Sequence, residues 1–145
     1  VQALAISALA ESGSEAAAKV TGICYVGKES AISLRIPATG LERMTDLLRI
    51  YRMGLARPLP VFPKSSYAFA GETPGPRTKK TPLDRAISAW NNGIYGIENS
   101  AECQDPWIRA AFGDFDPMGT QQGEFMELSL RIWKGYGEHQ ESFQP

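Results

Sequence analysis

The expected fold is set by one stretch, Ala31–Ala70, which reads AISLRIPATGLERMTDLLRIYRMGLARPLPVFPKSSYAFA. Its β-branched start predicts a strand over Ala31–Ile36. Thr39 stands three residues before Glu42, which is the spacing of a capping box, so a helix is expected to begin there. The apolar residues of that helix recur at helical spacing and form one stripe, made up of Leu41, Met44, Leu47, Leu48, Tyr51 and Leu55.

The helix is expected to stop at Gly54 and Pro58. Beyond it, the apolar segments Leu59–Phe62 and Tyr67–Phe69 predict a return to an edge or irregular strand, because prolines interrupt them. Upstream, Lys19–Val26 is rich in β-forming residues and predicts a strand. Gly27–Ser30 would join it to Ala31–Ile36 as an antiparallel hairpin, and Val1–Ile6 is either a strand or the end of an earlier element.

Three helices are expected in the second half of the chain. Thr81 and Pro82 are typical of a helix start, and Asp105-Pro106 is expected to open a short helix. The last helix is expected over Glu124–Lys134. Each helix carries one tryptophan on its apolar face, which favours core packing over base stacking for Trp90, Trp107 and Trp133.

Length and composition predict one domain over residues 1–145, with a frayed tail at 137–145. The chain starts at Val1 rather than Met, so we expect a C-terminal fragment of a longer polypeptide. No apolar run reaches the roughly 20 residues of a membrane span. Cys24 and Cys103 form no pattern, which favours a reducing cytoplasm, and the apolar neighbours of Cys24 predict a buried thiol.

Charge is unevenly distributed. Residues 43–80 contain eight basic side chains against two acidic ones, whereas residues 98–127 contain seven acidic side chains and one basic one. This pattern has two interpretations: a basic face for nucleic acid beside an acidic face for a protein, or an ordinary solvated surface. Under the first interpretation, the candidates for DNA or partner contact are Arg49, Arg52, Arg57, Arg77, Lys79 and Lys80.

Catalytic and cofactor motifs are missing from the sequence. It contains no glycine-rich phosphate loop, and its one histidine, His139, lies in the tail. The strands expected at Lys19–Val26 and Ala31–Ile36 carry no Asp or Glu, so they offer a hard cation no ligands. We therefore expect no metal and no cofactor in this domain.

The order of two strands, a Thr-Gly turn and an amphipathic helix resembles the core of the PD-(D/E)XK nuclease fold. The segment of that family with a carboxylate and a lysine corresponds here to Ile36–Gly40, so the catalytic positions hold Ile36 and Ala38. The upstream carboxylate would fall at Cys24 or Tyr25. The resemblance implies an α/β (α+β) fold, a restriction-endonuclease-like mixed sheet flanked by helices, without catalytic residues.

A second resemblance is to the C-terminal domain of the exodeoxyribonuclease V gamma subunit, RecC. From about Val20 onward the chain is similar to that family in the order of its motifs, which are Tyr51, Gly54, Pro58-Leu59-Pro60, Pro63-Lys64 and Asp105–Phe112. Membership would imply a non-catalytic domain in a complex with RecB-like and RecD-like subunits. It would also imply work on double-strand DNA ends in recombination and repair.

Two other functions stay open at this point. One is an active metal nuclease whose ligands are rearranged to Glu29, Glu42 or Asp46; the other is an unrelated small-molecule-binding α/β domain. The isolated fragment is also expected to be able to self-associate through apolar surface left exposed without its partners.

Overall fold

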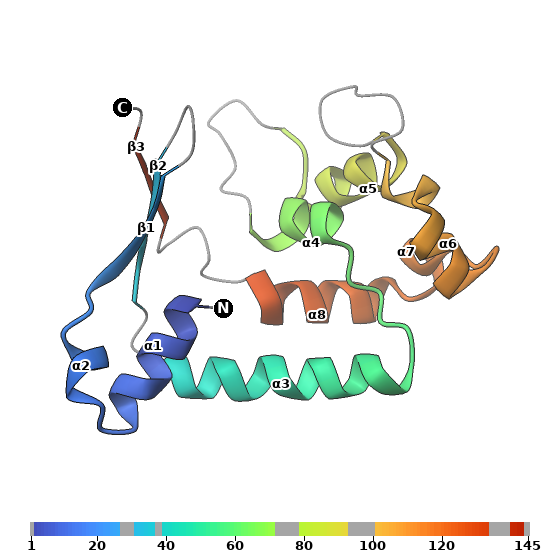
Figure 1. Cartoon of the computed structure of the whole chain (residues 1–145). Coiled ribbons are helices and arrows are strands. Elements are labelled where there is room, and N and C mark those ends of the chain that lie inside the picture. Colours follow the sequence, from blue (N-terminus) through green and yellow to red (C-terminus); the bar gives the residue numbers. More distant parts are fainter. Residues whose placement is uncertain are drawn as a thin grey trace. The chain divides into compact units, whose positions relative to one another are not determined.

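The computed structural model describes residues 2–26, 31–36, 39–71, 79–92, 101–133 and 140–143 (Figure 1). The chain divides into two compact units, residues 1–51 with 135–145, and residues 52–134. The first unit contains α1 (Gln2–Glu11), α2 (Glu15–Ala18), the strands and most of α3 (Gly40–Ala56). The second contains the end of α3, then α4 (Pro63–Ala70), α5 (Pro82–Asn92), η1 (Glu102–Gln104), α6 (Pro106–Phe112), α7 (Pro117–Thr120) and α8 (Gln122–Trp133).

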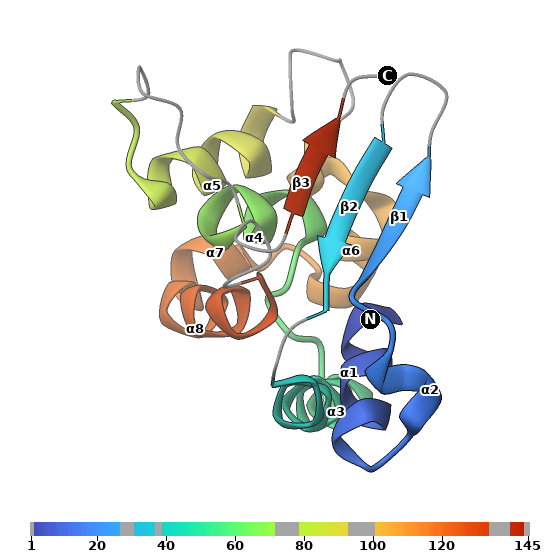
Figure 2. The same ribbon diagram turned by 90° about the vertical axis from the view of Figure 1, so that its left-hand side faces the viewer.

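The strands of the first unit form one antiparallel sheet of order β1-β2-β3 (Figure 2). In the hairpin, β1 (Gly22–Val26) pairs with β2 (Ala31–Arg35), with Gly22 opposite Arg35. This confirms the antiparallel pairing expected here, while the connecting loop Gly27–Ser30 lies outside the described residues. On the other side of β2, the strand β3 (Gln140–Phe143) places Phe143 opposite Ala31. Residues of the tail for which fraying was expected thus form a strand.

The predicted fold class is wrong. The described residues are mostly helical, and their three strands all run antiparallel. A restriction-endonuclease-like mixed sheet needs parallel as well as antiparallel neighbours. The main local reason is the segment after α3, where strands were expected at Leu59–Phe62 and Tyr67–Phe69: the first is neither strand nor helix, and the second lies in α4.

α4 is a helix because its N-terminus is capped from a distant part of the sequence. Pro63 occupies the first turn, where a missing N–H is harmless. The buried carboxylate of Glu102 accepts hydrogen bonds from the backbone N–H groups of Lys64 (2.8 Å) and Ser65 (2.7 Å) and from the Ser65 hydroxyl (2.6 Å). These bonds satisfy N–H groups that a helix start otherwise leaves without an acceptor. The local sequence of α4 contains no signal that predicts this cap.

The first unit contains a similar long-range cap. The helix α1 covers Gln2–Glu11, so the prediction of a strand at Val1–Ile6 is wrong. The Glu11 carboxylate at its end accepts from the backbone N–H of Gly40 at 2.7 Å and of Leu41 at 3.3 Å, and the buried Ser7 hydroxyl accepts from Gly40 at 3.0 Å. A Cβ on Gly40 would collide with Ser7, so glycine is required where α1 meets the start of α3.

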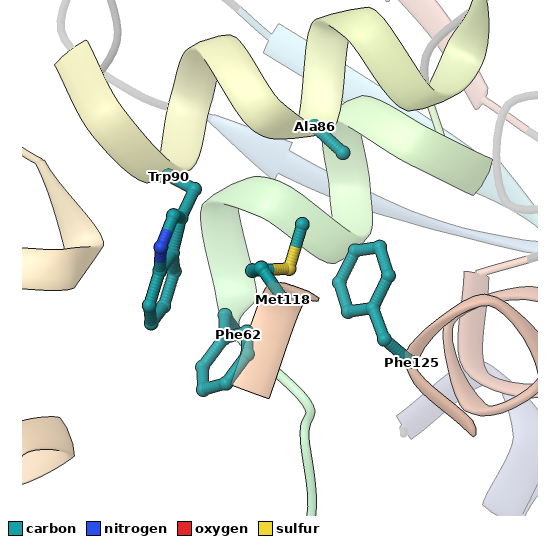
Figure 3. Packing of buried hydrophobic residues seen from close by; sticks show 5 residues of the cluster. All are labelled: Phe62, Ala86, Trp90, Met118 and Phe125. Atoms are coloured by element: carbon teal, nitrogen blue, oxygen red, sulfur yellow. The ribbon is translucent and has the colours of Figure 1, made fainter. Parts of the chain in front are cut away.

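The core of the second unit lies where α4, α5, α7 and α8 meet (Figure 3). The Phe62 ring stacks at 6.3 Å on Phe125 from α8 and lies 4.5 Å from Trp90 of α5. Ala86 and Met118 complete the cluster. The core position expected for Trp90 is therefore confirmed, since it is 8% exposed.

The helix starts expected at Thr81 and Asp105 are confirmed. The Thr81 hydroxyl accepts from the Asp84 backbone N–H (3.1 Å), and the Asp84 carboxylate accepts from the Thr81 N–H (3.0 Å), which is a capping box. The Asp84 carboxylate also accepts from the Thr81 hydroxyl at 2.7 Å, and this hydrogen bond together with the one from the Thr81 N–H holds the pKa of Asp84 below its usual value. The Asp105 carboxylate accepts from the Trp107 N–H at 2.8 Å and caps α6.

Removal of the Glu102 carboxylate is expected to destabilise the second unit. Glu102→Ala leaves two backbone N–H groups without their acceptor, so we expect a loss of about 2–3 kcal/mol of unfolding free energy. Urea unfolding followed by tryptophan fluorescence would measure it. The matched control is Glu127→Ala, whose 66% exposed side chain pairs with Arg131 within α8, and a change of under about 0.5 kcal/mol is expected. Equal losses in the two variants would contradict the capping role of Glu102.

Candidate protein-docking surface

An exposed row of large apolar side chains runs along α3. Leu41, Leu48, Tyr51 and Leu55 are 52%, 56%, 64% and 70% exposed. They follow one another at spacings of seven, three and four residues, so they lie on one side of the helix, and Met44 falls in the same row. We call these five residues the α3 stripe. Ile50, 6% exposed, lies on the opposite side of the helix.

α3 is held by contacts made outside the stripe. At its N-terminus, the carboxylate of Glu11 caps the first turn. Just beyond its C-terminus, the guanidinium of Arg57 pairs with the carboxylate of Glu124, with Nη1 donating to Oε2 at 3.2 Å. This hydrogen bond raises the pKa of Arg57. Contiguous exposed apolar surface of this kind usually marks an interaction site.

The basic residues predicted to contact DNA or a partner have different surroundings. Arg49, Arg52 and Lys79 are exposed, and no ion pair of theirs occurs among the described residues. Arg57 is engaged by Glu124, and the Lys80 ammonium donates to the Ser88 hydroxyl at 3.1 Å. Arg77 lies outside the described residues. Arg49 belongs to the first compact unit and the other described ones to the second.

The positions expected to hold degenerate catalytic residues lie at the hairpin. Cys24 of β1 stands opposite Ser33, and Tyr25 stands opposite Ile32. The thiol of Cys24 is exposed, so the prediction that it is buried is wrong. The Ile36 backbone N–H donates to the Thr21 carbonyl at 3.2 Å, just past the end of β2. Ala38 is not among the described residues.

The described part of the chain contains no group of three or more His, Cys, Asp or Glu side chains placed to hold a metal ion. Of the alternative ligands considered above, Glu42 and Asp46 lie on α3, Glu42 being exposed and Asp46 half-buried. Glu29 lies outside the described residues.

Sequence reasoning missed a second exposed feature, Trp107. Its side chain is 84% exposed, so the predicted core position is wrong. In the seven-residue helix α6, Ile108 and Phe112 pack against the core one turn apart, which turns the neighbouring Trp107 outward. It borders a groove of about 550 Å³, with Pro63, Lys64 and Pro106 among the lining residues.

In the described parts of the chain, no helix combines the length and the apolar character needed to cross a membrane.

A mainly helical fold with an exposed apolar helix face is typical of a module that binds another protein. The family model of the RecC C-terminal domain matches residues 1–73, a span from the start of α1 to just past the end of α4. Because the match covers half of the chain, the chain belongs to the RecC C-terminal domain family. This confirms the resemblance seen in the sequence, although Asp105–Phe112 lies outside the match. No curated protein and no solved structure matched the chain.

The two sides of α3 should respond differently to substitution. Leu55→Ser removes a side chain that is 70% exposed, so the unfolding free energy should change by less than about 0.5 kcal/mol. Ile50→Ser places a hydroxyl at a buried position on the same helix and should cost about 2–4 kcal/mol. Thermal or urea unfolding of both variants is the measurement. A large loss in Leu55→Ser would show that the stripe is covered within the chain.

Proposed function

We propose that the chain is a non-catalytic docking domain of the gamma subunit of an exodeoxyribonuclease V complex. In this role it joins RecB-like and RecD-like subunits that act on double-strand DNA ends during recombination and repair. Membership in the RecC C-terminal domain family supports the assignment of the chain to such a complex. The α3 stripe supports the docking role.

The α3 stripe is the observation that carries this proposal. It lies within residues 1–73, the part of the chain that matches the family. Four of its side chains are more than half exposed, although burial of the part that is still exposed would stabilise each by roughly 1–2 kcal/mol. A partner that covers this surface would stabilise it. Hot spots of protein interfaces are rich in buried aromatic side chains, and Tyr51 would become one of these when the partner binds.

Retention of partner subunits is the direct test. The chain would be co-expressed with the RecB-like and RecD-like subunits of its own organism and purified through a tag on the chain. At least one subunit should stay bound at moderate salt, and Leu48→Ser with Tyr51→Ser should reduce retention at least tenfold. The control is Met53→Ser, a partly exposed apolar residue on the other side of α3. If the unmodified chain retains neither subunit, the docking proposal fails.

The non-catalytic part of the proposal has its own test. The purified chain would be incubated with linear double-stranded DNA in the presence of Mn²⁺ or Mg²⁺. No cleavage above that of a mock purification is expected. Cleavage that disappears in Glu42→Gln or Asp46→Asn would show an active metal nuclease instead.

A second function, contact with the split DNA strands, is favoured by Arg49, Arg52 and Lys79, three of the predicted contact residues, which are exposed and form no ion pair among the described residues. Contacts to phosphates release counterions, so the affinity would fall steeply as the salt concentration rises, without dependence on base sequence.

The salt dependence of DNA binding checks this function. The triple variant Arg49→Gln, Arg52→Gln, Lys79→Gln should lower the slope of log K against log salt by about 2–3 for duplex DNA, because each lost phosphate contact removes about 0.9. Fluorescence anisotropy of the assembled complex at several salt concentrations would measure the slope. Lys19→Gln, an exposed charge outside residues 43–80, serves as the control. An unchanged slope in the triple variant would rule out phosphate contact by these residues.

A further inference from the structure

We draw no further inference here: the strongest candidate, the groove of about 550 Å³ between the starts of α4 and α6, is lined by side chains of both charges, Lys64, Glu102 and Asp105, and nothing in the structure shows what covers it.

Discussion

The arrangement of the second unit depends on the contact between the Glu102 carboxylate and the first turn of α4. A helix start leaves N–H groups without acceptors, and this one is buried, with Ser65 and Ser66 inaccessible to solvent. The Glu102 carboxylate accepts from the N–H groups of this first turn, 37 residues away from Ser65 in the sequence, and thereby holds η1 against α4. The Ala68 carbonyl near the other end of α4 accepts from the Arg85 side chain at 3.0 Å. With both ends tied to later elements, Phe62 is held between Trp90 and Phe125.

The same physical device shapes the first unit and has a consequence for function. Glu11 and Ser7 anchor the start of α3, and Ile50 is buried, while the most apolar side of the helix, the α3 stripe, is exposed. That side stays in contact with solvent and is available to a partner. An amphipathic stripe normally covers the core of its own chain, whereas the α3 stripe is exposed, and this difference is the basis of the proposed docking role.

Sequence patterns succeeded where the signal and the structure it predicts lie close together. The hairpin of β1 and β2, the capping box at Thr81 and the helix start at Asp105 all depend on contacts between near neighbours. The patterns failed where a distant residue decides. Leu59–Phe69 has the prolines and aromatic residues of an irregular strand, but Pro63–Ala70 is the helix α4, whose first turn is capped by the distant carboxylate of Glu102, and Leu59–Phe62 is neither helix nor strand. The prediction of a core position for Trp107 failed for a related reason, because a helix of only two turns packs just one face against the core.

By itself, the sequence determined the family, the hairpin, the uneven distribution of charge and the existence of a stripe on α3, because each of these is a property of neighbouring residues or of their order. Only the tertiary structure decided that the stripe faces solvent, that α4 is a helix and that the sheet is a small antiparallel one. The hydrophobic effect does not depend on which segment covers an apolar surface. Periodicity therefore shows which side of a helix is apolar but not what covers that side. For α3, the structure also supplies the cap of its first turn, where the backbone N–H groups of Gly40 and Leu41 donate to the Glu11 carboxylate about 30 positions away.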